Sequence, residues 1–511
     1  MLRNHDVLVI ASIARESFSI AAREALVAGL PVITSDCLGP EEVVHDGENG
    51  LVVTTGSAGE LAAAMASLLD EPGRLDELRG GAAEAPVTVR SPSRHVDDLI
   101  ELYGATAPTT PRRQWNVAFV VGADGAIARY RVHHPSESLR LHGATTRVVH
   151  YLDPTLERVA DGMDAVVLQR VPATAHVLHL VEHWRSAGLL VVFDVDDLIV
   201  DPTMVDRIPG PDALPAADRE RYVDGLHRYR TTLEHCDGAI VPTTPLAESI
   251  GRTTGLPVAV VPNGLGLVEL RLAVAATSTL RTDRSSTTLA YFSGSDSHQA
   301  DLDLISGPLA DLMRERPEVE LLLVGPITPG PALAPLADRI THRDFQPWTL
   351  LYEQLAAVDV NLAPLVLPSE FNEAKSAIKW LEAAAVGVPT VASATRPFLD
   401  AIDDDRTGVL CADLDDWSAS LTALVDDPLR RRRLGRAARR RAELAHGPHV
   451  TAFAYTAALD QLAERRVADR VSAWVDRAPD ERAPSAPPLD PYRLAGDGRR
   501  VRRRWWPRRR R

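Results

Sequence analysis

Short apolar runs alternate with amphipathic stretches of helical period over most of the chain. The runs are bounded by polar residues or glycines, and they predict strands at 117–121, 147–151, 165–169, 189–193, 239–241, 258–261, 289–292, 320–324 and 360–363. The amphipathic stretches predict helices at 134–142, 174–187, 216–235, 297–314, 349–357 and 374–386. Strands that alternate with helices of this length are typical of βαβ units and parallel sheets. The pattern therefore predicts an α/β protein with two doubly wound sheets, and the change between them falls near residues 266–286.

A short segment near the N-terminus recurs later in the chain, 358 residues further on. Residues 24–35 read EALVAGLPVITS and residues 382–393 read EAAAVGVPTVAS. In each copy a glycine ends the helix, because a residue without Cβ turns left-handed easily, and a proline two residues later opens the next strand. The repeat predicts one supersecondary unit of strands and helices that the chain uses twice.

The repeat and the composition together predict the domain organisation. The first copy has too few strands for a complete sheet, so it is expected to form a partial Rossmann-like half-domain. A stretch rich in proline and threonine has no periodicity and reads as a linker. The end of the chain is rich in proline and then in arginine, which does not support a packed core. The predicted parts are the half-domain, the linker, two complete domains and a disordered basic tail, at 1–104, 105–114, 115–270, 271–465 and 466–511.

Charge and cysteine content narrow the class of protein. The 511 residues carry a net charge of −14, and residues 499–511 hold nine arginines and no acid, so the rest of the chain carries −23. Residues 1–498 are so acidic that their overall electrostatic field does not attract nucleic acid. No apolar run reaches the roughly 18 residues of a membrane-spanning helix, and no signal peptide is recognised. The three cysteines are too few and too far apart for a disulfide framework or a zinc site, which predicts a cytoplasmic protein.

The distribution of lysine singles out one segment. Of the 56 basic residues only two are lysines, Lys375 and Lys379, which lie four positions apart. On the helix predicted for 374–386 they share one face, and the compact charge of a lysine is not interchangeable with the fork of an arginine. Such a preference for arginine over lysine usually reflects a GC-rich genome. The alternative to a functional role is therefore that the two remaining lysines lie close together by chance.

Two glutamates at helical spacing lie at and before the start of the first copy of the repeat. Glu16 and Glu24 are eight positions apart, a little over two helical turns, so one helix can place both carboxylates on one face. A helix N-terminus beside Glu16 would offer free N–H groups to a phosphate. One carboxylate can then hold sugar hydroxyls and the other a ribose. Two glutamates alone are more often a solvated face, but here they are followed by Ala-Gly-x-Pro-Val and Asp-Gly-x-x-Gly.

With these motifs, residues 16–53 resemble the nucleotide-sugar-binding half of retaining GT-B glycosyltransferases of the family-four, or group 1, type. Residues 115–465 resemble a complete member of a divergent branch met in surface-polysaccharide clusters. The matching segments are FDVDDLIVDP (193–202), VPTTPLAESI (241–250), VPNG (261–264), YFSGSDSHQADL (291–302) and EFNEAKSAIKWLEAAAVGVPTVAS (370–393). The resemblance implies a GT-B fold of two Rossmann-like domains, preceded by a truncated copy of the C-terminal half.

The resemblance also assigns roles to the glutamates. Glu24 and Glu382 occupy the second glutamate of the family motif, which binds the ribose of the donor. Glu16 occupies the first, which contacts the donor sugar. In the second copy this position is Ala374, with Glu373 beside it, and this departure puts the sugar contact there in doubt.

The lysine segment is expected to bind the diphosphate of the donor. Lys375 and Ser376, at the predicted start of the helix, would supply a cation and a hydrogen bond. Lys379, one turn further on, is either a second phosphate contact or a salt-bridge partner. The sequence leaves these two roles open.

The loop at 293–298 departs from the family pattern. The family usually places an arginine and a lysine in the loops after the first two strands of this domain, but Ser293-Gly-Ser-Asp-Ser-His298 contains neither. Gly294 and Ser295 would let the backbone approach a phosphate. His298 either donates to the phosphate or has a purely structural role. The missing charge suggests that Lys375 has taken over phosphate binding.

Two segments of the first complete domain are candidates for its side of the site. Gly125 ends a glycine turn after the first strand, a position that faces the cleft in this fold. Asp194, Asp196 and Asp197 follow the strand at 189–193, where open α/β sheets bind ligands. These acids are expected to be catalytic or to orient the acceptor, and the alternative is capping of the next element. An Asp-x-Asp motif also resembles the metal site of GT-A enzymes, which the two-sheet layout disfavours.

Taken together, the resemblance implies transfer of a sugar from a UDP- or GDP-sugar to a glycan or lipid-linked acceptor in cell-surface polysaccharide biosynthesis. No metal or other cofactor is expected, and the leaving diphosphate would act as its own base. A non-catalytic scaffold is the alternative, because of Ala374 and the uncharged loop; a Rossmann oxidoreductase fails for lack of the glycine fingerprint. The first copy is either a truncated gene product or a module docked on a partner. The tail suits an anionic membrane surface at the inner face of the plasma membrane, or is simply a flexible end.

Overall fold

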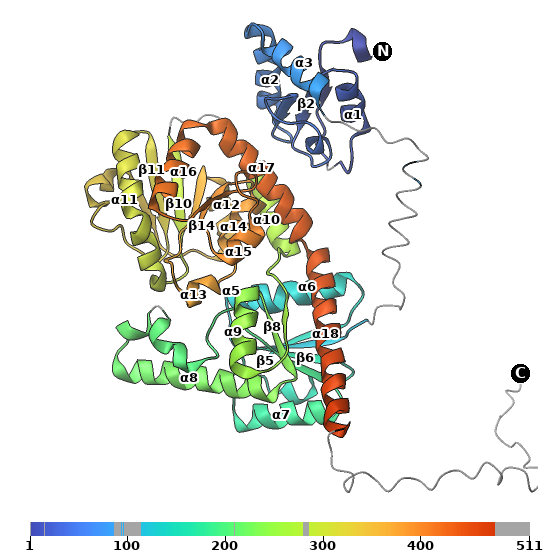
Figure 1. Cartoon of the computed structure of the whole chain (residues 1–511), viewed down its shortest axis with the longest axis vertical. Helices are drawn as coiled ribbons and strands as arrows, with labels where there is room; N and C mark the ends of the chain where they lie inside the picture. The colour runs from blue at the N-terminus through green and yellow to red at the C-terminus, as the bar shows by residue number, and fades with distance from the viewer. Residues whose placement is uncertain are drawn as a thin grey trace, which may run out of the picture. The chain divides into compact units, whose positions relative to one another are not determined.

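The structure is a computed structural model of the chain, shown in Figure 1. It describes residues 2–14, 16–85, 94, 96, 114–208, 210–278 and 286–475. The chain divides into two units, Met1–Leu462 and Ala463–Arg511, and three parallel sheets lie in the first. The predicted linker, apart from its last residue, and the arginine-rich tail lie outside the described residues. Within the described part of the chain, no helix is both long enough and apolar enough to cross a membrane.

The first sheet has three strands and belongs to the first copy of the repeat. Its order is β1-β2-β3, all parallel, with β1 (Leu8–Ile10), β2 (Val32–Ser35) and β3 (Gly50–Val53). The helices of this part are α1 (Ile20–Val27), α2 (Ala58–Asp70) and α3 (Arg74–Glu84). A small core of residues from α1, β2, β3 and α3 holds them together. Among the described residues no strand pairs with the outer edge of β1.

The second sheet forms the first complete domain. Its six parallel strands have the order β5-β4-β6-β7-β8-β9: β4 (Val117–Val121), β5 (Thr146–His150), β6 (Ala165–Gln169), β7 (Leu190–Asp194), β8 (Gly238–Val241) and β9 (Val258–Val260). The central strands are buried along their whole length, which explains their continuous apolar sequences. The helices are α5 (Ala126–Ala128), a π-helix (Arg129–His133), α6 (His134–Leu141), α7 (Ala175–Ser186), α8 (Ala216–His235) and α9 (Thr244–Thr254).

The third sheet forms the second complete domain. Its order is β12-β11-β10-β13-β14-β15: β10 (Thr287–Phe292), β11 (Val319–Val324), β12 (Ile340–Arg343), β13 (Val360–Ala363), β14 (Thr390–Ser393) and β15 (Val409–Cys411). One face packs on α11 (Gln299–Glu315) and α16 (Leu414–Asp426). The other packs on α10 (Leu267–Ser278), α12 (Leu351–Ala356), α14 (Ile378–Ala385) and α17 (Pro428–Ala445). Two short helices, α13 (Glu370–Glu373) and α15 (Arg396–Ala401), flank α14 in sequence.

The last helix, α18 (Pro448–Val475), returns to the first complete domain. Tyr455 packs against Phe119 of β4 with 5.7 Å between ring centroids, and the indole of Trp115 donates to Asp460 over 2.8 Å. This crossing completes the GT-B arrangement, so the predicted fold class, two doubly wound parallel sheets after a partial one, is confirmed. The predicted boundaries at 270 and 465 fall inside α10 and α18.

The two copies of the repeat have matching elements at the same offset. Helix α1 at 20–27 corresponds to α14 at 378–385, and β2 at 32–35 corresponds to β14 at 390–393. In both copies the helix begins later than the sequence pattern predicted. The predicted helix over 374–386 is therefore wrong in its first turn, and Glu16 lies before α1 rather than on it. In the first copy Ser19, at the helix entry, has a left-handed backbone (φ 37), which stops the helix from extending back to Glu16.

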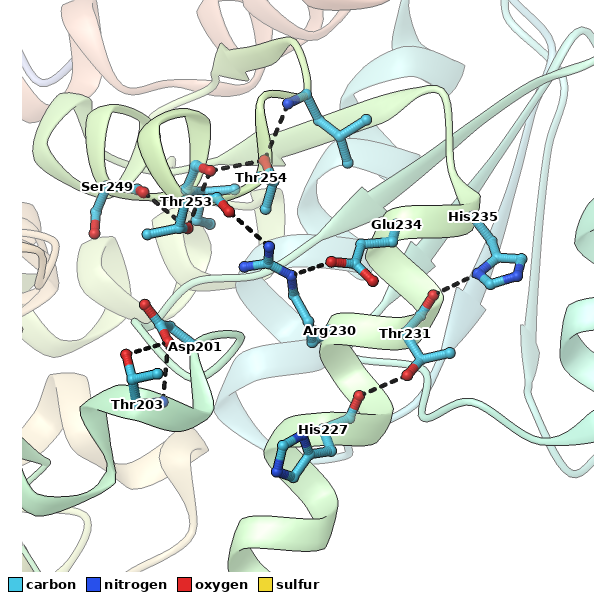
Figure 2. Close-up of polar contacts among 12 residues, drawn as sticks. Asp201, Thr203, His227, Arg230, Thr231, Glu234, His235, Ser249, Thr253 and Thr254 are labelled. Carbon is cyan, nitrogen blue, oxygen red and sulfur yellow. Dashed lines mark hydrogen bonds and ion pairs between the residues drawn. The ribbon is translucent and has the colours of Figure 1, made fainter.

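Polar contacts fix α8 against the C-terminal end of α9 (Figure 2). Arg230 of α8 binds Glu234 on its own helix and donates to the carbonyl of Thr253, each over 2.6 Å. The last carbonyls of a helix carry partial negative charge, so a guanidinium there is favourable. Helix α9 also reaches the second complete domain, because Arg252 pairs with Glu370 of α13 over 2.7 Å.

Candidate functional site

A cavity of about 330 Å³ lies between the two complete domains, at the carboxyl ends of their strands. Open α/β sheets bind ligands at this edge. Residues after β4 and β7 line it from the first domain, and residues after β10, β12 and β13 and on α14 line it from the second. Predicted site residues form much of its wall: Asp196, Asp197, Gly294, His298, Lys375, Ser376, Lys379 and Glu382.

Other predicted residues lie elsewhere. Gly125, Asp194 and Ser295 do not line the cavity, although each is next to or near a residue that does. Glu16 and Glu24 belong to the part with the three-stranded sheet. Within the described residues, that part contains no counterpart of the strands and loops that form the rest of the cavity wall.

Lys379 presents a buried ammonium group to the cavity. Its Nζ lies 3.9 Å from the centroid of the Tyr291 ring and has no hydrogen-bond partner. Burial, together with the charge of Lys375, lowers the pKa of Lys379 to about 7, against the opposing charges of Asp301 and Glu382. Among the described residues no carboxylate pairs with Lys379, so the salt-bridge role that the sequence left open is not observed.

Lys375 and Ser376 lie in the loop between α13 and α14. The Nζ of Lys375 is 4.6 Å from the centroid of the Phe371 ring, and the hydroxyl of Ser376 accepts a 3.0 Å hydrogen bond from Asn263. The carbonyl of Ala374 accepts a bond from Thr243 of the first domain. These bonds hold the loop in a non-helical path, so the predicted shared helical face for the two lysines is wrong. Both nevertheless line the same cavity.

His298, directly before α11, is oriented by an acidic residue in the first turn of that helix. Its Nδ1 lies 2.9 Å from Asp301, whose other carboxylate oxygen accepts from the backbone N–H of Val366. Burial lowers the pKa of His298, helped by the two lysines and opposed by Asp301. Because Nδ1 is engaged, Nε2 is the ring nitrogen that remains for a ligand. The same loop has space at Gly294, where a Cβ would meet no atom within 4 Å.

Glu382 is held by two residues of the first complete domain. Its Oε1 accepts hydrogen bonds from the hydroxyl of Tyr130 over 2.6 Å and from Arg129 over 3.3 Å. Burial raises the pKa of Glu382, whereas Arg129 and the Tyr130 hydrogen bond oppose that rise. The guanidinium of Arg129 also pairs with Glu269 over 3.1 Å and lies 4.5 Å from the Trp348 ring centroid.

Arg129, Tyr130 and Trp348 line the cavity but were not predicted as site residues. The available signal was position, since Arg129 and Tyr130 come directly after the glycine turn that ends at Gly125. They lie on the π-helix, a rare element that is frequent at functional sites. Gly125 itself has φ +87, a backbone conformation that turns the chain into this segment, and a Cβ at this position would meet no atom within 4 Å.

Asp194 is part of a buried ion pair and does not reach the cavity. It is 0% exposed, and its two oxygens accept from Nε and Nη2 of Arg131 over 2.9 and 2.8 Å. Burial raises the pKa of Asp194 and the charge of Arg131 opposes the rise. Arg131 also donates to the carbonyl of Val261 and to Asn263. The geometry therefore gives Asp194 a structural place, against the predicted catalytic one.

Asp196 and Asp197 line the cavity and share one guanidinium. Arg170 donates from Nε to Asp196 over 2.7 Å and from Nη2 to Asp197 over 2.8 Å. Burial would raise the pKa of Asp197, but the charges of Lys375 and Arg170 lower it below its ordinary value. The alternative role as helix caps is not seen, because Asp201 caps the next 3₁₀ helix through Thr203 (Figure 2).

The described residues contain no group of three or more His, Cys, Asp or Glu side chains placed to hold a metal ion. The site instead combines two lysines, two aspartates, one histidine and one glutamate around a single cavity. Such a set can bind an anion, accept hydrogen bonds from hydroxyl groups and exclude water when the domains are closed.

Comparison with known proteins finds one family twice. Residues 1–84 and residues 288–427 each match Glycosyl transferases group 1. The D-inositol 3-phosphate glycosyltransferase of Streptomyces avermitilis is 35% identical over 182 residues, which are 32% of this chain and 38% of the relative. The phosphatidyl-myo-inositol mannosyltransferase of Mycobacterium leprae is 41% identical over 68 residues, 13% of this chain and 18% of the relative. The chain thus spans less than two fifths of the length of these curated relatives.

Solved structures show more distant similarity. HepE of Anabaena in complex with UDP has 14% identity and a TM-score of 0.43, and the match covers 70% of this chain and 100% of that one. WaaG, described as a glycosyltransferase involved in lipopolysaccharide biosynthesis, has 14% identity and a TM-score of 0.45, covering 68% of this chain and 99% of that one.

Proposed function

We propose that the chain transfers a sugar from a nucleoside-diphosphate sugar, a UDP- or GDP-sugar, to a glycan or lipid-linked acceptor, and that the donor binds in the cavity between the two complete domains. The observation that carries the proposal is the buried ammonium of Lys379, which faces the cavity without a partner, next to Lys375 and Ser376. Burial without a counter-ion lowers the pKa of this amine to about 7, and an anion that arrives with the ligand would restore its charge.

The pairing of charges in the cavity wall supports a diphosphate. Three arginines in or behind the cavity wall already have a carboxylate: Arg129 pairs with Glu269 and Glu382, Arg131 with Asp194, and Arg170 with Asp196 and Asp197. Neither lysine has a carboxylate within ion-pair distance among the described residues. Among the arginine and lysines that line the cavity in the described chain, the two lysines therefore remain for the two phosphates of a donor.

The remaining residues fit the other parts of a nucleotide sugar. The carboxylate of Glu382, on α14, would accept hydrogen bonds from the ribose. His298 donates from Nδ1 to Asp301, so its Nε2 would donate to a phosphate once the ring is an imidazolium, a form that the phosphate charge favours. Asp196 and Asp197 would orient the acceptor hydroxyl, and the leaving diphosphate would act as the base in a transfer with retention. The names of the relatives, a D-inositol 3-phosphate glycosyltransferase and a phosphatidyl-myo-inositol mannosyltransferase, support sugar transfer.

We assign catalysis to residues 115–465 and not to the first copy. Residues 1–84 match the same family as residues 288–427, and α1 and α14 correspond in their bounds, which supports a tandem origin. Glu24 would bind a ribose there, with Glu16 near the donor sugar. The described part of the first copy has a sheet of only three strands, so it would need further cavity walls from another segment or protein before it could act.

A non-catalytic scaffold is the second candidate. It is favoured by Ala374, which stands where the family motif has its first glutamate, and by the loop at 293–298, which has no arginine or lysine. Such a protein would keep the fold without binding or turning over a donor.

The proposal is tested by calorimetric titration of UDP and GDP against the full chain, with and without EDTA. Micromolar binding of one nucleotide, unaffected by EDTA and weakened about 100-fold by Lys379→Met or Lys375→Ala, is expected. Arg316→Gln is the matched control, since this cation of the same domain pairs with Asp426 away from the cavity. Absence of binding by the wild type would favour the scaffold, and a metal requirement would favour the Asp-x-Asp interpretation.

We propose in addition that the tail at 499–511 binds an anionic membrane surface, which would bring a cytoplasmic enzyme to a lipid-linked acceptor. Co-sedimentation of the protein with vesicles that contain anionic lipid should fall when the tail is deleted. With neutral vesicles it should be weak whether the tail is present or deleted.

A further inference from the structure

Arg170 does not line the candidate site but contacts two residues that do. It follows β6 directly and does not line the cavity, yet its guanidinium contacts both cavity-lining aspartates that follow β7. Its side chain is 11% exposed, so the contacts are largely shielded from water. Arg170 lies outside the segments that resemble the family motifs.

The backbone of Arg170 is held in an unusual conformation. Its φ is +46, in the left-handed region that non-glycine residues rarely occupy. Its N–H donates to the carbonyl of Asp194 over 3.0 Å, and its own carbonyl approaches Gly122 so closely that a Cβ there would lie 2.2 Å away. Strained backbone of this kind persists only where the surroundings fix it, and it is frequent at active sites.

The side chain makes a fork that a lysine cannot reproduce. Nε and Nη2 approach Asp196 within 2.7 and 2.6 Å, and Nη2 approaches Asp197 within 2.8 Å. A planar guanidinium sets the relative orientation of both carboxylates, whereas an ammonium supplies only a point charge. With backbone and side chain both fixed, the two aspartates have one defined position at the cavity wall.

The groups that face Asp197 come from four other parts of the fold. They are Lys375 in the loop before α14, His298 before α11, Tyr222 on α8, and Arg170 after β6. Asp196, the neighbour of Asp197 along the chain, also faces it. Lys375, Arg170 and His298 favour the ionised form of Asp197, against the effect of burial. Loss of the Arg170 charge would therefore raise the pKa of Asp197.

We propose that Arg170 is a positioning residue, which holds Asp197 ionised and oriented at the cavity wall so that it accepts a hydrogen bond from the hydroxyl group that attacks the donor. This inference rests on the proposed function, because it concerns the acceptor side of the same cavity. It assigns a role in turnover to a residue outside the cavity lining, and it gives a functional reason for the strained backbone at Arg170.

The test measures donor hydrolysis, with water in place of the acceptor hydroxyl, by release of UDP from UDP-glucose or of GDP from GDP-mannose, whichever nucleotide binds. Arg170→Gln should leave nucleotide affinity within about twofold and lower the turnover rate about 100-fold, because misplaced groups cost that much. The acid limb of its pH–rate profile should move to higher pH. Arg170→Lys keeps the charge but not the fork, so it should restore the acid limb without restoring the rate.

Two comparisons separate this role from a structural one. Asp197→Asn should lose as much rate as Arg170→Gln, and the double variant should lose little more, since the two act as a unit. Arg185→Gln removes another Arg–Asp pair of the same domain, 3.0 Å from Asp237, and should leave rate and pH profile unchanged. Unchanged turnover in Arg170→Gln, or equal losses of turnover and nucleotide binding, would overturn the inference. Failure of the wild type to bind a nucleotide would instead overturn the proposed function.

Discussion

The guanidinium of Arg129 donates to Oε1 of Glu382 over 3.3 Å and so connects the first complete domain to the second. Tyr130 reaches the same oxygen, so one carboxylate of the candidate site is shared by both domains. A second contact joins Thr243 to the carbonyl of Ala374, next to Lys375. The position of the candidate donor-binding residues thus depends on how the two domains are closed on each other.

Loss of the carboxylate at position 382 should weaken nucleotide binding. Glu382→Gln keeps the shape of the side chain but removes the charge, and we expect UDP or GDP to bind at least about tenfold more weakly, since charge-assisted hydrogen bonds are the strong ones. Tyr130→Phe is the matched variant, because it removes one hydrogen bond to Glu382 and keeps the carboxylate. It should change the affinity by less than about threefold in the same calorimetric titration. A larger loss in Tyr130→Phe than in Glu382→Gln would contradict a ribose role for Glu382.

The titration of Lys379 should be visible in the stability of the protein. Its pKa is lowered to about 7 in the folded protein, whereas a lysine in the unfolded chain titrates at about 10.4. Between these pH values the unfolded state binds the additional proton, so the free energy of unfolding rises with pH. Thermal unfolding at several pH values between 7 and 10 should show this rise in the wild type and a smaller one in Lys379→Met. Identical pH dependence in the two proteins would show that the ammonium is not buried.

Nucleotide binding should also take up a proton. A diphosphate beside Lys379 favours the charged amine, so its pKa rises on binding and a proton is absorbed at pH 8. Calorimetry in two buffers of different ionisation enthalpy measures this uptake. Lys379→Met should reduce it, and an equal uptake by Lys379→Met would place the diphosphate away from this residue.

Asp194 should be needed for stability rather than for turnover. Removal of one partner of a buried ion pair leaves an uncompensated charge, so Asp194→Ala should lower the free energy of unfolding by about 3–5 kcal/mol. Denaturant unfolding gives this value. An Asp194→Ala variant that is as stable as the wild type and binds the nucleotide normally, but has no turnover, would contradict this prediction and indicate a catalytic role for Asp194.

The fold was largely predictable because its strands are buried on both faces. Strands such as β4 and β6 are continuous apolar runs, and their predicted bounds agree with the structure. Strand β12 was missed, since its sequence Ile-Thr-His-Arg lies at the edge of the sheet with three of four residues exposed and gives no apolar run.

The candidate site was predictable only in part. Motif positions placed Lys375, Lys379 and Glu382 around one cavity, but the predicted helical face for the lysines was wrong, because contacts from the other domain hold the loop at Ala374–Ser376. Arg129 and Trp348 are 219 positions apart in the sequence and meet only through domain packing, so no local pattern could join them.

The central claim is that the cavity between the two complete domains holds the diphosphate of a nucleotide-sugar donor. A crystal structure of the full chain with UDP or GDP tests it most directly. The account predicts phosphate oxygens within hydrogen-bond distance of Lys375, Lys379 and Ser376, with the ribose against Glu382. A nucleotide bound elsewhere, for example against Glu24 of the first copy, with the two lysines left without an anion, would contradict it.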